Sequence, residues 1–231
     1  MMKKALLPFI LLAAFAGQAQ ENIPFDKRYF PDDKDGLKEA RRNLKTGDAI
    51  FEERNTAHYN LAIPAYAAAH TFNPDNAELN YKLGVCHLYS DAKAKSLPYF
   101  EKSFSLDPNF DAYNIHYLLG RGFHLNARWD EAAREYEVQL ATLRRLGGDT
   151  EEFATINKLL KEVENGKILT QTKERVWIDN LGPAINSAAP EYAPLISTDE
   201  SLLILTARRE GGVGGLVDDS DNRPYEDLYF S

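Results

Sequence analysis

Cysteine is nearly absent from this 231-residue sequence, and no long run of basic residues occurs in it. The only cysteine, Cys86, excludes an intrachain disulfide. Its distance from the N-terminus also excludes a lipid-anchored cysteine at the start of a mature chain. The formal net charge is −8, which argues against nucleic acid and anionic membrane surfaces as partners. We interpret the acidity as a means of keeping the protein soluble.

Apolar runs long enough to span a bilayer are also missing. The longest apolar stretch, over residues 5–17, directly follows Lys3 and Lys4. Small residues then stand at Gly17 and Ala19, where signal peptidase requires them. The pattern predicts a signal peptide over residues 1–19, with no transmembrane segment after its removal. The mature protein is therefore expected in the periplasm or outside the cell.

Helical spacing rich in Ala, Leu and Tyr occupies residues 37–148, after an irregular lead-in over residues 20–36. Two similar turns, FNPDN and LDPNF, place Pro74 and Pro108 34 residues apart. Small and aromatic residues recur at 34 residues and then at 36 residues. The three sets are Ala62, Tyr66 and Ala69, then Ser96, Phe100 and Ser103, then Ala132, Tyr136 and Gln139.

Gly84 and Gly120 stand in the first helix of the second and third pairs, in YKLGVCH and YLLGRGF, where they are expected to let the two helices of a pair approach closely. The pattern resembles tetratricopeptide repeats, which implies an α-solenoid of three helix pairs. The first helix of the first pair reads as degenerate. The three aromatic residues are expected to fill the gap to the next pair. A helix over residues 149–166, with Gly166 as its stop, is expected to cap the array.

The helical spacing stops after residue 173, and short apolar runs with frequent turn signals follow. Val176–Ile178 form one such run. Residues 193–197 and 202–207 form two more, joined by Thr-Asp-Glu-Ser, and residues 226–231 form the last. These runs predict an all-β unit over residues 167–231. The GGVGG stretch lacks the flanking strand and helix of a phosphate loop, and we interpret it as a mobile hairpin tip.

Three stretches of this region, NLGPAINS, YAPLISTDESLLILTARR and YEDLYFS, resemble the first blade of a WD40-like β-propeller. The propeller belongs to a family of periplasmic, outer-membrane-associated proteins in bacteria with type IX secretion and gliding motility. Family members combine a signal peptide, tetratricopeptide repeats, the propeller and usually a C-terminal OmpA-like domain. Glu200 stands where typical blades have Gly, so the turn departs from the family pattern. The implied fold is mainly α, a tetratricopeptide α-solenoid followed by an incomplete first blade.

The resemblance implies a non-enzymatic scaffold that binds outer-membrane proteins and links secretion or motility machinery to the cell wall. Peptidoglycan would be bound only by a C-terminal domain that this sequence does not contain. Two alternatives stay open. The sequence could be the N-terminal, propeller-containing part of a longer peptidase or hydrolase, or an adaptor that docks its strands onto another subunit's open sheet edge.

Protein binding in such a solenoid is expected in the groove formed by the first helix of each pair. Tyr and Arg often anchor interfaces, and the same side chains could instead pack against neighbouring helices. The residues expected in the groove are Tyr81, Val85, Leu88, Tyr89, Asn114, Tyr117, Arg121 and His124.

Chemistry-bearing motifs are scarce, and no catalytic, cofactor-binding or metal-ligating residue is predicted. His116 and His124 could share a helix face, but no carboxylate stands at a spacing that completes a zinc site. Cys86 reads as a small packed residue. The acidic stretch Asp218–Asn222 lacks the Gly and terminal Glu of a calcium loop, so a solvated turn is favoured over a calcium site.

Overall fold

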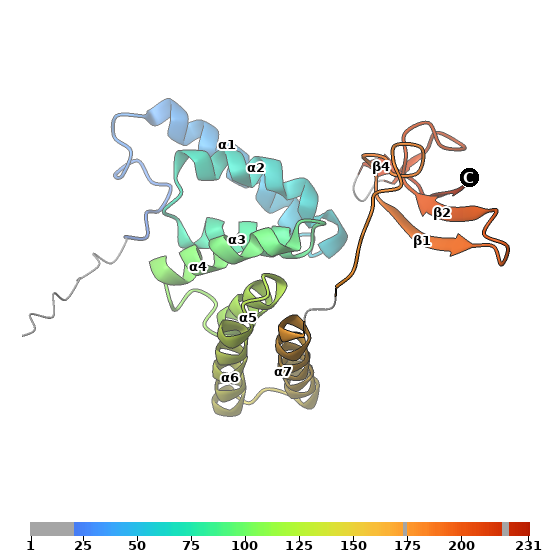
Figure 1. The fold of residues 1–231 in the computed structure, drawn as a ribbon. Coiled ribbons are helices and arrows are strands. Elements are labelled where there is room, and N and C mark those ends of the chain that lie inside the picture. Colours follow the sequence, from blue (N-terminus) through green and yellow to red (C-terminus); the bar gives the residue numbers. More distant parts are fainter. Residues whose placement is uncertain (1–20, 173–174, 219–221) are drawn as a thin grey trace, which may run out of the picture.

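The computed structural model describes residues 21–172, 175–218 and 222–231 of the chain. The predicted signal peptide over residues 1–19 lies outside these ranges. The described chain is mainly helical, with a small antiparallel sheet near the C-terminus (Figure 1), so the predicted mainly α class is confirmed. Its α-helices are α1 (Lys34–Phe51), α2 (Tyr59–Phe72), α3 (Ala77–Leu88), α4 (Leu97–Leu106), α5 (Ile115–Leu125), α6 (Trp129–Leu146) and α7 (Thr150–Gln171); two 3-10 turns, η1 (Thr56–His58) and η2 (Lys93–Ser96), precede α2 and α4.

Local signals in the sequence explain where several helices begin and end. The side chains of Asp33 and Asn76 accept hydrogen bonds from backbone N–H groups in the first turns of α1 and α3. Asp149 and Glu152 form a reciprocal capping box at the start of α7. α6 ends at Leu146, and the following Gly147 has a φ of 84°, a left-handed conformation that glycine adopts at little cost.

Each helix packs against the next one along the chain, from α1 to α7. Within three successive pairs, an aromatic ring lies flat against a glycine of the preceding helix. A Cβ atom built on Gly84 would lie 2.5 Å from Phe100, and one on Gly120 would lie 2.5 Å from Tyr136. The predicted role of these glycines in close helix approach is therefore confirmed. These rings were expected to fill the gap to the next helix pair, but the glycine that each ring contacts belongs to its own pair.

The first pair follows the same rule, although the sequence of its first helix is degenerate. α1 is a regular helix of 18 residues that begins at Lys34, inside the predicted lead-in. A Cβ atom on Gly47 would lie 2.5 Å from the ring of Tyr66, as in the other two pairs. The small residues Ala62, Ser96 and Ala132 are all fully buried at equivalent positions.

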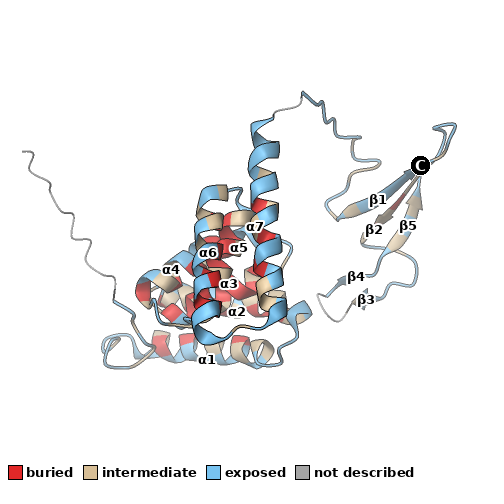
Figure 2. Ribbon diagram, turned by 90° about the horizontal axis from the view of Figure 1, so that it is seen from below, coloured by how far each residue is buried: buried red, intermediate tan, exposed pale blue. Residues whose placement is uncertain are grey.

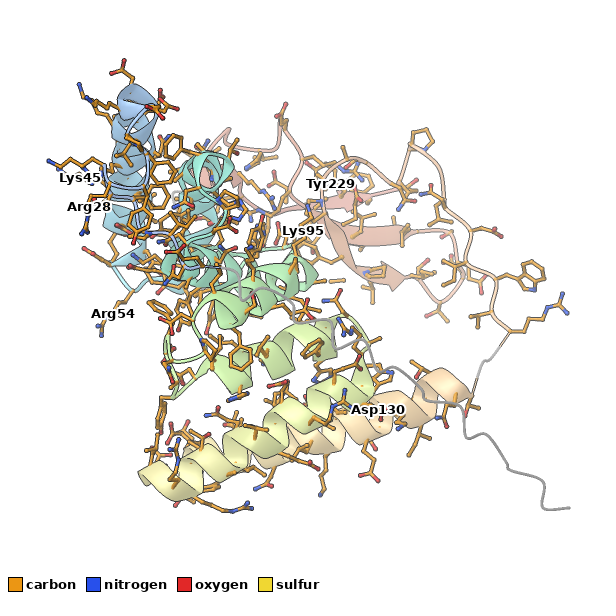
Figure 3. All side chains as sticks on the ribbon, turned by 90° about the vertical axis from the view of Figure 1, so that its left-hand side faces the viewer. Arg28, Lys45, Arg54, Lys95, Asp130 and Tyr229 are labelled. Carbon is orange, nitrogen blue, oxygen red and sulfur yellow. The ribbon has the colours of Figure 1, made fainter. Side chains whose placement is uncertain are left out.

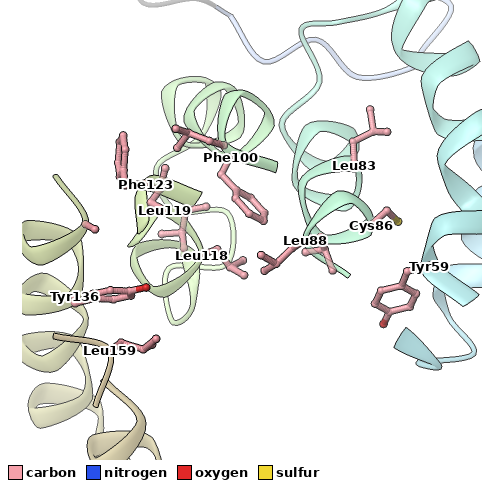
Figure 4. Packing of buried hydrophobic residues seen from close by; sticks show 14 of the residues in the cluster. Tyr59, Leu83, Cys86, Leu88, Phe100, Leu118, Leu119, Phe123, Tyr136 and Leu159 are labelled. Carbon is pink, nitrogen blue, oxygen red and sulfur yellow. The ribbon is translucent and has the colours of Figure 1, made fainter. Parts of the chain in front are cut away.

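Buried side chains from α2 to α7 form one continuous apolar core (Figure 4). Phe100, Leu119 and Tyr136 lie in its interior, and burial in α3 raises the pKa of the Cys86 thiol to about 12. Cys86 is 0% exposed, in agreement with its reading as a packed residue. Figure 2 shows buried residues concentrated among the helices, with the sheet largely exposed.

α7 is longer than predicted, because it continues through Gly166 to Gln171. Gly166 serves close packing instead of termination. A Cβ atom at this position would lie 2.7 Å from the indole ring of Trp129 at the start of α6. The indole Nε1–H also donates a hydrogen bond to Thr170 Oγ1 over 3.0 Å, which holds the last turn of α7 against α6.

The C-terminal strands form a three-stranded antiparallel sheet in the order β1-β2-β5, and a separate two-stranded hairpin of β3 with β4. The predicted hairpin across Thr-Asp-Glu-Ser and the predicted last strand are both confirmed. The Val176–Ile178 run is not a strand among the described residues, which corrects that prediction. The strands are β1 (Glu191–Ile196), β2 (Leu203–Ala207), β3 (Val217–Asp218), β4 (Arg223–Pro224) and β5 (Asp227–Phe230).

The glycine stretch over residues 211–215 connects β2 to β3 and is not the tip of the small hairpin, which corrects that part of the interpretation. The N–H of Val213 donates to the carboxylate of Asp227 over 2.8 Å, so this connection is tied to the start of β5. Arg209 lies over the ring of Tyr229, with its Cζ 4.7 Å from the ring centroid.

Two half-buried histidines, His70 and His87, predict a pH dependence of stability. The rings of His70 and His87 lie 5.5 and 5.2 Å from that of Tyr99, and His87 is stacked on it. His70 Nε2 lies 3.2 Å from Asn80 Oδ1. The charge of Lys102 disfavours protonation of His70 and that of Asp75 favours it, while the charge of Lys95 disfavours protonation of His87. Burial lowers the pKa of both imidazoles below the ordinary 6.5.

The folded state therefore holds these histidines neutral, and the unfolded state takes up their protons first on acidification. Their contribution to stability is fully present above about pH 6.5 and is lost as the pH falls below it. We expect Tm to fall between pH 7.5 and 5 in scanning calorimetry, and His87→Phe to reduce that fall. An equal fall in wild type and variant would contradict the assignment.

Candidate partner-binding groove

A hollow of about 840 Å³ opens between the end of α1, the face of α3 and the start of α5. Its walls are mainly aromatic and apolar, with a few charged groups at the rim. They are formed by Phe51, Glu52, Arg54, Thr56, Tyr59, Tyr81, Lys82, Val85, Tyr89, Asn114, Tyr117 and Leu118.

A second, smaller hollow of about 320 Å³ continues from the first toward the N-terminus of α7. The two hollows share Asn114 and Tyr117, so together they form one groove across α3, α5 and α7. We call it the tyrosine groove. The second hollow is lined by Asn114, Tyr117, Gln139, Leu143, Asp149, Glu151, Glu152, Thr155 and Ile156.

The tyrosines of the groove are held by specific contacts. Tyr81 donates its hydroxyl to Asp111 Oδ2 over 2.5 Å, and its ring meets that of Phe110 edge-on. Burial, reinforced by the Asp111 carboxylate, raises the pKa of Tyr81 above its ordinary value. Tyr59 and Tyr89 meet edge-on at 5.8 Å, and Tyr89 is 50% exposed. The groove therefore offers fixed aromatic edges that can receive apolar side chains.

Charge differs between the two ends of the groove. At the first hollow, Lys82 contacts Asp48 and Glu78 at 2.8 and 2.7 Å. Burial disfavours its charge, but hydrogen bonds to these carboxylates raise the pKa of Lys82 above the ordinary value. Arg54 is exposed and extends outward beside the end of α1 (Figure 3).

The second hollow ends on Asp149, Glu151 and Glu152 in the first turn of α7. Two of these carboxylates have internal partners, because Asp149 and Glu152 cap the helix and Tyr113 donates to Glu152 over 2.6 Å. Glu151 is exposed. This end of the groove therefore suits a cationic group, and the aromatic end suits an apolar one.

The structure brings together five of the eight residues expected in the groove. Tyr81, Val85, Tyr89, Asn114 and Tyr117 all line the first hollow. The other three do not line either hollow. Leu88 is buried in the core, Arg121 lies outside both hollows, and His124 contacts the rings of Trp129 and Tyr136.

Sequence reasoning missed the contribution of α1 and its following turn. Phe51, Arg54 and Tyr59 line the groove beside Tyr89, although they precede the second repeat unit. Gly47 could have indicated that these residues line the groove. It packs as Gly84 and Gly120 do, and so identifies α1 as the first helix of a full pair.

The remaining histidines have structural partners. His116 Nδ1 lies 2.7 Å from Glu135 Oε2 on α6, and His124 packs against the same helix. Within residues 21–172, 175–218 and 222–231, no group of three or more His, Cys, Asp or Glu side chains is placed to hold a metal ion. The calcium alternative at Asp218–Asn222 falls mostly on residues 219–221, which lie outside the described residues.

No protein-family model matches the chain, and no curated protein matches it. Among the described helices, none combines the length and the apolar character needed to cross a bilayer. The candidate site therefore rests on its geometry.

Proposed function

We propose that the protein is a non-enzymatic scaffold of the periplasm that binds an outer-membrane protein in the tyrosine groove. The helical part is interpreted as a tetratricopeptide solenoid, and the sheet as the beginning of a WD40-like propeller. A link to peptidoglycan would need an OmpA-like domain beyond this sequence. The observation that carries the proposal is the groove itself, with two hollows joined at Asn114 and Tyr117.

The groove has the properties of a peptide-binding surface. Tyr81 and Tyr117 come from α3 and α5, the first helices of successive pairs, so the spacing of these two side chains follows the spacing of the helices. Tyr89 and Tyr117 offer large contact areas with little conformational entropy to lose on binding. An extended segment with an apolar side chain and a nearby Lys or Arg fits the aromatic and acidic ends together.

Tyr117→Ala tests the proposal, because this side chain belongs to both hollows. The probe is the detergent-solubilised outer-membrane protein fraction of the producing cell, passed over the immobilised mature chain. We expect the wild type to retain one outer-membrane protein, and Tyr117→Ala to reduce retention by about tenfold or more. Retained protein is quantified by mass spectrometry, and circular dichroism verifies unchanged helicity.

Glu137→Ala and Arg121→Glu are matched controls, because Glu137 is exposed on α6 and neither residue lines the groove. Both variants should retain the partner as the wild type does. Equal retention by Tyr117→Ala would reject the groove as the binding surface. Failure of the wild type to retain any outer-membrane protein selectively would reject the function.

A further inference from the structure

The sheet has an open hydrogen-bonding edge along β5. Leu203 and Ser231 exchange both of their backbone hydrogen bonds, each at 3.0 Å. In an antiparallel ladder such pairs alternate with residues whose N–H and C=O groups point the other way. Tyr229 therefore faces β2, whereas Leu228 and Phe230 direct their backbone groups outward. The order β1-β2-β5 leaves that side of β5 without a neighbouring strand among the described residues.

A segment with strand-like composition lies unpaired elsewhere in the chain. Val176, Trp177 and Ile178 are 69, 80 and 90% exposed and belong to no helix or strand. β-branched and aromatic residues of this kind favour strands, because they pack well on a pleated surface. Single exposed apolar residues are ordinary, but three consecutive ones indicate a surface that is covered by a partner.

The segment and the open edge match each other residue by residue. A strand centred on Trp177 beside Tyr229 places Val176 and Ile178 next to Leu228 and Phe230, whichever direction it runs. Leu228 and Phe230 are themselves 75 and 82% exposed. On this face the register already aligns Leu195, Ile204 and Phe230 across the sheet, so the new strand extends an existing apolar row.

On the opposite face, Trp177 would lie beside Tyr229, whose ring is already covered by the guanidinium of Arg209. Arg175 lies over Trp177, with its Cζ 5.2 Å from the ring centroid, so both rings would carry a cation. Pairing would satisfy the outward N–H and C=O groups of Leu228 and Phe230 and bury all three apolar side chains of the segment.

The position of the segment favours a second copy of the chain as its acceptor. A turn over residues 181–186 connects it to β1, with the N–H of Leu181 donating to Asn186 Oδ1 over 3.0 Å. Arg209 holds this turn through a hydrogen bond to the Ile185 carbonyl. The segment thus reaches the sheet at β1, and β5 is the opposite edge (Figure 2).

One five-residue strand buries little surface, whereas specific interfaces usually bury about 1,600 Å² in total. Reciprocal exchange doubles the buried area and closes the assembly with two-fold symmetry. We propose that two copies of the chain associate by exchanging residues 175–179, each segment adding a fourth strand to the open edge of β5 in the other copy.

The experiment is sedimentation equilibrium of the mature full-length chain, combined with amide hydrogen exchange. The mass should rise reversibly from that of one chain to that of two as the protein concentration is raised to about 100 μM. This is the concentration range in which a small interface of this type associates. With the added strand antiparallel to β5, the amides of Leu228 and Phe230 and those of Val176 and Ile178 should become protected together in the dimer.

Proline substitutions separate backbone pairing from side-chain burial. Leu228→Pro removes an N–H that points away from β2, so the existing ladder stays intact and edge strands tolerate proline. Its matched control, Leu228→Ala, keeps the N–H. We expect the proline variant to weaken association by about tenfold, and the alanine variant by about threefold or less. Ile178→Pro and Ile178→Ala repeat the comparison in the segment, where no existing element can be damaged.

Each other outcome overturns the proposal. A single-chain mass at every concentration excludes association. Protection of Leu228 and Phe230 in a monomer would show pairing within one chain and would exclude exchange. A dimer that neither Leu228→Pro nor Ile178→Pro weakens would be formed by another surface. None of these results depends on the tyrosine groove, so the scaffold proposal is tested separately.

Discussion

Gly84→Ala is expected to lower the free energy of unfolding by about 1–2 kcal/mol, although alanine is the better helix former. The gain in helix propensity is about 1 kcal/mol. Against it, the new Cβ would lie 2.5 Å from the ring of Phe100, whose side chain is fully buried. Overpacking of this kind typically costs about 1–3 kcal/mol and sometimes more. Urea unfolding monitored by circular dichroism measures the difference.

The steric origin of this effect is tested with Phe100→Leu as the second mutation. A smaller side chain at position 100 leaves room for the Cβ, so Gly84→Ala should cost much less in the Phe100→Leu background. The pair should therefore show a coupling free energy of about 1 kcal/mol or more. Equal costs in both backgrounds would mean that the glycine serves another purpose than contact with this ring.

The same contact explains why so much of the helical part could be predicted from the sequence. Gly84 and Phe100, like Gly120 and Tyr136, recur at fixed spacing because each helix pair solves one packing problem in the same way. Periodicity reports such internal contacts well. Gly47 escaped notice because the residues around it in α1 share little else with the other first helices, although its packing against Tyr66 is the same.

The groove was only partly predictable, because periodicity shows which residues share a helix face but not what covers that face. Tyr81 and Tyr117 were placed correctly by their spacing on first helices. Leu88 and His124 belong to the same helices, but neighbouring elements cover them, α6 in the case of His124. Arg54 entered the groove through the turn after α1, whose position depends on how the first pair packs.

In the sheet, sequence reasoning found the strands that pair locally. The hairpin of β1 and β2 needs only a short turn, and the hydroxyl of Ser197 and the carboxylate of Asp199 stabilise that turn internally. Val176–Ile178 has equal strand propensity but no partner within the described residues. Propensity thus identifies residues that fit a strand, while strand formation itself requires an adjacent edge.

Asp48→Ala is expected to lower the free energy of unfolding by about 2 kcal/mol, because one carboxylate oxygen joins three helices. Asp48 Oδ1 on α1 accepts from the hydroxyl of Tyr66 on α2 and from Nζ of Lys82 on α3, each over 2.8 Å. Removing it leaves the hydroxyl of the fully buried Tyr66 without its acceptor, and an unsatisfied buried group costs about 1–3 kcal/mol. Lys82 retains Glu78 at 2.7 Å, so its charge stays paired.

Two matched variants identify which part of this contact matters. Asp48→Asn keeps an acceptor oxygen for Tyr66 and removes the charge, so it should cost less than Asp48→Ala. In a Tyr66→Phe background the orphaned hydroxyl no longer exists, and Asp48→Ala should then cost about 1 kcal/mol less than in the wild type. Thermal or urea unfolding of the four variants measures these differences. If Asp48→Ala has the same cost in both backgrounds, the Tyr66 bond contributes nothing, and the cost comes from the lost attraction between Asp48 and Lys82.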